Sequence, residues 1–313
     1  MNAKRVLFIG SKQLGLRVLQ EMYLLAPDKI IGVLTVDDKD DTRTKYKEIV
    51  QFANKHKLEL YVATNRTHSE EIIAKLQPDI SFVVGWYWLM HRSTLERVPG
   101  GFIGIHNSVL PKYRGGSPLI WPIIKGENEV GFSIFTFTDG LDEGPIWAQG
   151  KVSVGDNDYI SDVLEKLETL TIDVMRQSYL GIINGTLGPV DQAHELATYC
   201  SQRFPADGNI DWKRSAQEVF NFIRAQSDPY PGAFTYFEHQ QMIIWKARVF
   251  EFPYYGTPGQ VARILNDEVY VICGDDRAIV LQEVEVNGVR AKATKFIKSF
   301  KIRLSQVPTE KCL

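Results

Sequence analysis

The sequence predicts an α/β protein, with a doubly wound, mostly parallel sheet followed by a small β-barrel. Short apolar, β-branched runs alternate with segments of helical period over the first half of the chain. Short strands with turn signals between them dominate after residue 206. A stretch rich in Gly, Pro, Gln and Ser separates the two patterns. We therefore expect an α/β domain over 1–184, a linker over 185–206 and a barrel-like domain over 207–313.

Each element of the first domain follows from its apolar pattern. Apolar runs predict buried strands at 4–10, 30–36, 58–62, 80–84 and 102–105. Apolar residues at helical spacing predict helices around Leu14–Met22, Tyr46–Ala53 and Ile72–Leu76, the last ending before Pro78. Strands at 132–137 and 146–154 then read as a hairpin. A long helix carrying Val163, Leu167, Leu170 and Val174 closes the domain.

The second domain is expected to begin with a short helix over 215–224. Strands are predicted after it at 232–237, 242–250, 259–264, 268–273 and 278–284. Their regular spacing, with turn residues between them, suits a small barrel.

Composition and charge exclude several classes of protein. The 313 residues are 44% apolar and 24% charged, as in a globular protein, and the formal net charge of −2 argues against a generic polyanion binder. No apolar run reaches the roughly 20 residues that span a bilayer. The N-terminus enters a strand at once, leaving no room for a signal peptide. Cys200, Cys273 and Cys312 lie far apart without metal-ligand spacing, so we expect a cytoplasmic protein without a metal site or membrane contact.

The most informative segment runs Gly104-Ile-His-Asn-Ser-Val-Leu-Pro-Lys-Tyr-Arg-Gly115 and is followed by a glycine-flanked loop that contains Asp142. His106 follows a predicted strand and enters a polar turn, although a lone His is more often a structural residue. Asp142 can be a turn former, a role that Asp139 before Gly140 fits better. A His and an Asp at strand ends form a plausible acid/base pair.

Two further loops follow predicted strands. Gly10-Ser-Lys-Gln-Leu-Gly15 lacks the full dinucleotide fingerprint, so it is either a tight turn or a ligand-contacting loop. The helix N-terminus that it opens can hold an anion such as a phosphate. Trp86-Tyr-Trp88 can flank a flat heterocycle, such as a pterin, or pack the edge of the sheet.

These motifs resemble those of the formyltransferases that use N10-formyltetrahydrofolate. That family carries Asn-x-His-x-Ser-Leu-Leu-Pro-x-x-Arg-Gly and a later Leu-Asp-x-Gly, and Gly104 here stands where the family has Asn. The segments 204–212 and 228–234 resemble the appended domain of methionyl-tRNA and sugar-nucleotide formyltransferases. The resemblance covers nearly the whole chain and implies a Rossmann-like catalytic domain with an OB-like C-terminal domain.

The resemblance also implies site residues. His106 and Asp142 take the catalytic positions, and Asn107 is the first candidate to replace the missing amide at Gly104. N10-formyltetrahydrofolate, the formyl donor, is expected to contact Trp86, Tyr87, Trp88, Asp139 and Gly140. The acceptor is expected to contact Gly10, Ser11, Lys12, Tyr113 and Arg114. For Arg114, anchoring its own loop is the favoured alternative.

The acceptor is interpreted as the primary amine of a nucleotide-linked amino sugar. Basic residues between Arg290 and Arg303 are nearly offset by acidic residues between Asp267 and Glu285, which disfavours tRNA or any other nucleic acid. Two alternatives stay open: methionyl-tRNA formylation, and a non-catalytic folate- or nucleotide-binding protein. The sequence leaves open which sugar and nucleotide are used, what replaces the Asn, and whether the protein is an oligomer.

Overall fold

The computed structural model describes residues 2–308, which form two compact units. The first unit comprises Met1–Pro118, Val130–Val152 and Glu165–Ser201. The second comprises Leu119–Glu129, Ser153–Leu164 and Gln202–Leu313. Two stretches that precede residue 185, namely 119–129 and 153–164, therefore cluster with the second unit. The division into 1–184, 185–206 and 207–313 stays a prediction about domains.

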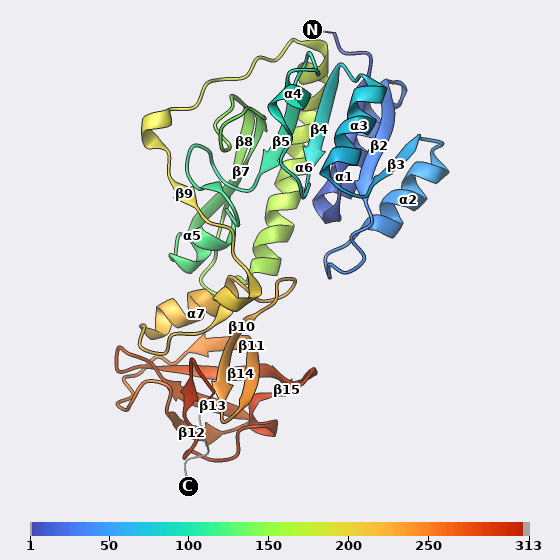
Figure 1. Ribbon diagram of the computed structural model, residues 1–313. Coiled ribbons are helices and arrows are strands. Elements are labelled where there is room, and N and C mark those ends of the chain that lie inside the picture. Colours follow the sequence, from blue (N-terminus) through green and yellow to red (C-terminus); the bar gives the residue numbers. More distant parts are fainter. Residues whose placement is uncertain (1, 309–313) are drawn as a thin grey trace. The chain divides into compact units, whose positions relative to one another are not determined.

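The first unit is built on a mixed, mostly parallel sheet with the strand order β3-β2-β1-β4-β5-β7-β8 (Figure 1). The strands are β1 (Val6–Gly10), β2 (Ile30–Val36), β3 (Leu60–Ala63), β4 (Ile80–Val84), β5 (Phe102–His106), β7 (Glu129–Thr136) and β8 (Ile146–Ser153). Pairs among β1 to β5 are parallel, and β7 joins β5 antiparallel. The predicted doubly wound α/β class is confirmed.

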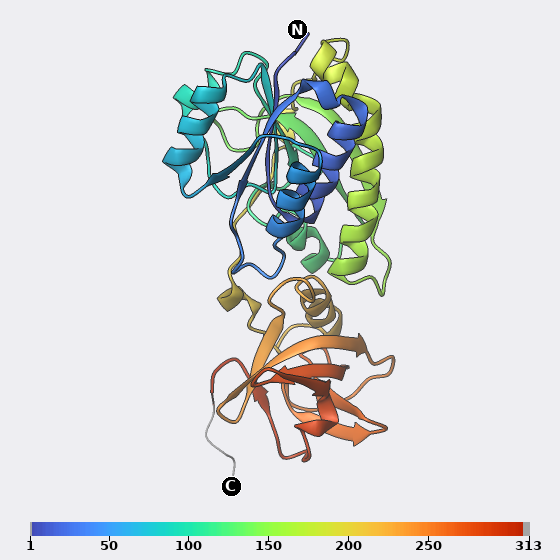
Figure 2. The same ribbon diagram turned by 90° about the vertical axis from the view of Figure 1, so that its right-hand side faces the viewer.

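Helices cover both faces of this sheet (Figure 2). They are α1 (Lys12–Leu25), α2 (Tyr46–Lys55), α3 (Arg66–Leu76), α4 (Arg92–Leu95) and α6 (Ile160–Asn184). On one face, Ile72 and Ile73 of α3 join Leu7, Val83 and Phe102 in a buried cluster. On the other face, the ring of Tyr179 from α6 meets that of Phe82 edge-on.

Sequence signals fix the ends of α3. The side chain of Asn65 accepts a hydrogen bond from the His68 backbone N–H, which caps the first turn. Gln77 then adopts a left-handed conformation before Pro78, so the helix cannot continue.

The topology determines where a ligand site is expected. Chain order in the sheet reverses between β1 and β4, and open α/β sheets bind ligands at the carboxyl ends of strands beside such a point. The loops after β1, β2, β4 and β5 all leave from this edge. They contain the Gly10–Lys12, Trp86–Trp88 and His106–Arg114 segments of the sequence interpretation.

The second unit has α7 (Ala216–Arg224) and the short α5 (Ile120–Ile124) beside an antiparallel sheet. Its strands are β10 (Ala233–Phe237), β11 (Gln240–Val249), β12 (Val261–Leu265), β13 (Glu268–Ile272), β14 (Ala278–Val286), β15 (Val289–Lys292) and β16 (Leu304–Ser305). The path β12-β13-β14-β11-β10-β16 curls so that a bridge joins Gln260 to Arg303 near its two ends. The predicted small barrel-like domain is confirmed.

Elements that the sequence analysis did not predict are short. They are α4, α5, β15, β16 and a two-stranded sheet of β6 (Arg114–Gly115) and β9 (Tyr199–Cys200). Elements of two to five residues are too short for a period to show. Within residues 2–308, no helix is long and apolar enough to cross a membrane.

Candidate active site

His106 is the last residue of β5 and is nearly buried, at 9% exposure. Its Nε2 lies 2.8 Å from the carbonyl oxygen of Tyr113. Because a carbonyl only accepts hydrogen bonds, Nε2 carries a proton and donates it. The other ring nitrogen, Nδ1, lies 3.6 Å from Asp142 Oδ2. That nitrogen can therefore take up a proton next to a carboxylate that stabilises the resulting imidazolium.

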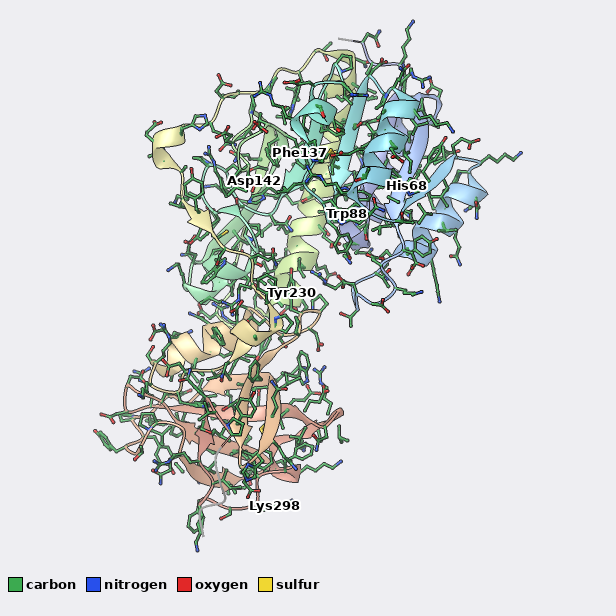
Figure 3. The ribbon with its side chains drawn as sticks, in the orientation of Figure 1. His68, Trp88, Phe137, Asp142, Tyr230 and Lys298 are labelled. Carbon is green, nitrogen blue, oxygen red and sulfur yellow. The ribbon has the colours of Figure 1, made fainter. Side chains whose placement is uncertain are left out.

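Asp142 is held in the loop between β7 and β8. Its Oδ2 accepts a hydrogen bond of 2.8 Å from the Gly115 backbone N–H. Its φ of +47° lies in the left-handed region, which is uncommon for non-glycine residues although Asp adopts it more readily than most. The structure thus brings together the two residues that the sequence interpretation paired. In Figure 3, Asp142, Phe137 and Trp88 lie in that order across the first unit.

Gly104 lies two residues before His106 in β5, so the two residues face the same side of the sheet. A Cβ added at Gly104 would lie 2.0 Å from Cε1 of Phe137, whose ring also packs 5.3 Å from that of Phe135. The volume that the family's Asn would need is therefore occupied by an aromatic ring. Glycine is the residue that fits beneath it.

Asn107, the candidate replacement for the missing amide, has a buried Oδ1 without a hydrogen-bond partner in the described residues. Buried polar atoms are rarely left in this state, and those that are call for an explanation. An unused acceptor one residue from His106 is compatible with a ligand contact. The catalytic role of Asn107 stays a prediction.

Arg114 has a fully buried side chain at 2% residue exposure. Its Nε and Nη2 donate to Gln192 Oε1 at 3.1 and 2.6 Å, and Nη2 lies 3.1 Å from His194 Nδ1. These contacts favour the structural alternative for Arg114. Tyr113 contributes its backbone carbonyl to His106. We call His106, Asn107, Asp142 and the Gly115 amide the His106 cluster.

The three aromatic residues after β4 have different neighbours: two pack on apolar side chains, and one bonds to a carboxylate. Trp86 and Trp88 pack edge-to-face at 5.2 Å and rest, with Phe137, on the Val83–Phe102 side of the sheet. Trp86 Nε1 is buried without a hydrogen-bond partner among the described residues. Tyr87 differs, since its hydroxyl lies 2.9 Å from Asp38 Oδ2.

Tyr87 belongs to a second group at this edge, the Lys12 cluster, which comprises Ser11, Lys12, Asp38, Asp41 and Tyr87. Lys12 Nζ lies 2.7 Å from a carboxylate oxygen of both Asp38 and Asp41. The Ser11 hydroxyl donates to Asp38 as well. The two carboxylates neutralise the cation at the N-terminus of α1, where the sequence suggested an anion site.

Electrostatics keep the carboxylates of the Lys12 cluster ionised. Burial by itself raises the pKa of Asp38, but hydrogen bonds from Lys12 and Ser11 outweigh it and hold that pKa below its ordinary value. The pKa of Asp41 is also lowered: burial opposes this, and hydrogen bonds from Arg43 and Lys12 outweigh it. Burial and the neighbouring Asp38 raise the pKa of the Tyr87 hydroxyl.

The remaining predicted contacts lie on the loops. A Cβ at Gly10 would lie 2.6 Å from the Val84 carbonyl oxygen, so this turn requires glycine for close strand approach. Asp139 is exposed, with Oδ2 3.8 Å from Arg92 Nη1, and a side chain at Gly140 would overlap the Glu143 carboxylate. Among residues 2–308, no group of three or more His, Cys, Asp or Glu is placed to hold a metal ion.

Sequence reasoning missed Asp38, Phe137 and Gln192. Asp38 had a signal, because a carboxylate two residues past β2 lies at the ligand-binding edge. No sequence signal marked Phe137 or Gln192, because each contacts residues that are distant in the chain. Cys312 lies outside the described residues, and Cys200 and Cys273 are free thiols.

Comparison with known proteins identifies the family. The family described as "Formyl transferase" matches residues 4–178, and "Formyl transferase, C-terminal domain" matches residues 204–301. This chain belongs to the formyltransferase family. A methionyl-tRNA formyltransferase from Acetivibrio thermocellus is 30% identical over 292 residues, which cover 91% of this chain and 93% of the relative.

Solved structures share the formyltransferase fold. An N-formyltransferase from Helicobacter canadensis, in complex with folinic acid and dTDP-3-aminofucose, aligns with a TM-score of 0.68 at 19% identity. That alignment covers 88% of this chain and 98% of the other. HypX from Aquifex aeolicus, in complex with tetrahydrofolic acid, aligns with a TM-score of 0.65 at 15% identity. It covers 96% of this chain, which spans about half, 48%, of the HypX chain.

Proposed function

We propose that this formyltransferase moves a formyl group from N10-formyltetrahydrofolate to the primary amine of a nucleotide-linked amino sugar. The observation that carries the proposal is the His106–Asp142 pair, with Nδ1 and Oδ2 3.6 Å apart at the ligand-binding edge of the sheet. The relative with bound folinic acid and dTDP-3-aminofucose supports both the donor and the acceptor class. A cytoplasmic setting is part of the proposal.

The residues beside His106 fit the donor. Trp86 and Trp88 offer aromatic surfaces to a flat ring, and the unpartnered Trp86 Nε1–H is a donor that a heteroatom can accept. Asp139 and Gly140 remain proposed contacts on the neighbouring loop. The donor supplies the formyl group, and the chain's own residues move the protons.

The proposed chemistry begins with a neutral amine on the acceptor. His106 Nδ1 takes the proton that the amine loses as it bonds to the formyl carbon, and Asp142 stabilises the charged ring. As the bond between that carbon and the donor nitrogen breaks, His106 returns the proton to the departing nitrogen. The Tyr113 carbonyl holds the opposite nitrogen in its protonated form throughout. With Phe137 in the place of the family's amide, Asn107 is the proposed donor to the charge that develops on the formyl oxygen.

The choice of a small acceptor over tRNA rests on charge pairing in the second unit. Arg290 contacts Glu283 at 2.7 Å and Asp228 at 2.6 Å, and Lys292 contacts Asp267 at 2.6 Å. Basic residues that are already paired offer little to a phosphate backbone. We expect tRNA to bind in the non-specific range of roughly 10⁻⁴ to 10⁻⁶ M at physiological salt.

Methionyl-tRNA formylation is the second candidate, because the relative from Acetivibrio thermocellus matches both parts of the chain at 30% identity. A direct assay separates the two. The protein is incubated with N10-formyltetrahydrofolate and either a panel of nucleotide-linked amino sugars or initiator methionyl-tRNA, and products are followed by mass. We expect formylation of at least one sugar. Formylation of the tRNA alone would reject the proposal, and donor binding without any product would favour a non-catalytic binder.

A further inference from the structure

Gln192, between α6 and β9, uses the whole hydrogen-bonding capacity of its amide. The residue is 6% exposed. Its Oε1 accepts from Arg114 Nε and Nη2, and its Nε2 donates to the carbonyl oxygens of Asp142 at 2.8 Å and Gly144 at 2.7 Å. An amide offers two donors and two lone pairs, so each is satisfied. Gln192 thus connects the loop that follows His106 to the loop that contains Asp142.

The orientation of this amide is fixed by a buried cation. A guanidinium can only donate, so Oε1 must face Arg114 and the NH₂ group must face the two carbonyls. Within residues 2–308, no carboxylate lies at ion-pair distance from Arg114, whose acceptors are the neutral Gln192 and His194. Hydrogen bonds from a buried charge are strong ones, and they prevent the amide from turning over.

The other end of Gln192 holds a conformation that the chain does not favour by itself. A left-handed backbone is uncommon for residues other than glycine, and Asp142 has φ +47°. Such a residue persists where its surroundings over-determine it. Gln192 holds the carbonyls on both sides of Glu143, and the Gly115 N–H holds the Asp142 carboxylate. Together they set Oδ2 against His106 Nδ1.

We propose that Gln192 is a positioning residue for formyl transfer, acting by fixing Asp142 against His106. Only the expected effect on kcat rests on the proposed function. Gln192 has no contact with His106 itself among the interactions above, so its effect passes through the backbone of Asp142. Loosening such a pair by about 1 Å can cost on the order of 100-fold in rate.

The substitution Gln192→Glu separates this role from a merely structural one. A carboxylate keeps the oxygen that accepts from Arg114 and forms an ion pair with it, so the fold is retained. Its second oxygen takes the place of Nε2 and cannot donate to the Asp142 and Gly144 carbonyls, so the loop is released. We expect kcat to fall about 10- to 100-fold with KM changed much less, while Tm stays at or above the wild-type value. A structural role would leave kcat unchanged in this variant.

Gln226 in the second unit supplies a matched control. It is also 6% exposed, accepts from Arg203 Nη2 at 2.7 Å and donates to the Phe222 carbonyl at 2.9 Å. Gln226→Glu therefore makes the same chemical change at a partly buried Arg–Gln–carbonyl bridge that lacks Asp142. We expect its kcat to equal that of the wild type.

A spectroscopic measurement tests the positioning role without any turnover. The histidine ring signals are observed in protein labelled with ¹³C at Cε1, and His106 is assigned by its loss in His106→Ala. We expect the His106 signal to shift in Gln192→Glu and to stay unchanged in Gln226→Glu.

An unmoved His106 signal together with kcat within about twofold of the wild type would overturn the proposal. If Gln192→Glu does not fold, the paired change Arg114→Met with Gln192→Met removes the buried cation as well and is read by the same signal. A wild type that formylates no acceptor would reject the proposed function, and the His106 signal would still decide the positioning role.

Discussion

The Lys12 cluster and the His106 cluster lie at the same edge of one sheet but differ in how far their polar groups are satisfied. In the Lys12 cluster the cation sits 2.7 Å from two carboxylates, and Tyr87 and Ser11 also bond to Asp38. In the His106 cluster, Nδ1 and Oδ2 remain 3.6 Å apart and Asn107 Oδ1 has no partner among the described residues.

The difference indicates which cluster is built for chemistry. A ligand that enters the Lys12 cluster must replace hydrogen bonds already made, so it gains only the difference between the two sets. A ligand at the His106 cluster meets acceptor capacity that is still unused. We therefore propose that turnover takes place at the His106 cluster and that the Lys12 cluster serves stability or ligand orientation.

The strongest test of this comparison is to remove either member of the proposed acid/base pair. His106→Ala and Asp142→Ala should each lower kcat by about 10²–10⁴, the usual contribution of a positioned proton-transfer group. Both proteins should remain folded, which circular dichroism and Tm check. Either variant with near wild-type kcat would remove that residue from the mechanism.

Asn107→Ala sharpens the comparison by testing the Asn107 amide, whose Oδ1 has no partner among the described residues. If the Nδ2–H group of this amide donates to the developing oxyanion, kcat should fall by about 10²–10³. Thermal stability should barely change, because Oδ1 makes no hydrogen bond that is lost. An active Asn107→Ala enzyme would mean that another group serves the formyl oxygen.

Gly104→Asn tests whether Phe137 closes the family's usual position. The new side chain must displace the ring that lies 2.0 Å from its Cβ, so we expect roughly a tenfold loss of kcat and a lower Tm. Adding Phe137→Ala should recover activity relative to Gly104→Asn alone, because the ring is gone. A double variant no better than the single one would show that the two positions are not coupled.

The smallest effect is expected from Asp38→Asn, which should change stability more than turnover. The pKa of Asp38 lies below its ordinary value of 3.8, so its ionised form stabilises the fold above that pH. This contribution is lost as pH falls through the lowered folded-state pKa. Asp38→Asn should thus have a lower Tm than the wild type at pH 7, and the gap should narrow below about pH 4. A gap independent of pH would contradict the assignment.

The sequence predicted what depends on local pattern. Alternating apolar runs predicted the order of strands and helices. The His106 and Asp142 motifs predicted a pair whose Nδ1 and Oδ2 lie 3.6 Å apart in the structure, and its acid/base role stays a proposal. Contacts between segments distant in the chain could not be predicted from the sequence. Gln192 lies in a stretch interpreted as a linker because it has no apolar period, yet its side chain bonds to residues 48 and 78 positions earlier. Phe137 was predicted to be part of a strand, and only the tertiary structure shows that its ring packs against Gly104.

The turn at Gly10, Ser11 and Lys12 shows that a motif can be located correctly while its interaction partners are missed. Gly10, Ser11 and Lys12 were correctly located at a strand-to-helix turn, and the sequence suggested an anion there. Asp38 and Asp41, which neutralise Lys12, come from the loop after β2. A pairing of this kind depends on how two loops meet and has no signature in either one.

The most direct test of the central claim is the single-turnover rate of formyl transfer to a nucleotide-linked amino sugar, measured by mass for the wild type and for Asp142→Asn. The substitution keeps the side chain's shape and one oxygen for the Gly115 N–H, but removes the charge that faces His106 Nδ1. We predict transfer by the wild type and a rate lower by about 100-fold or more in the variant. Equal rates in the two proteins would contradict the assignment of the His106 cluster as the site of chemistry.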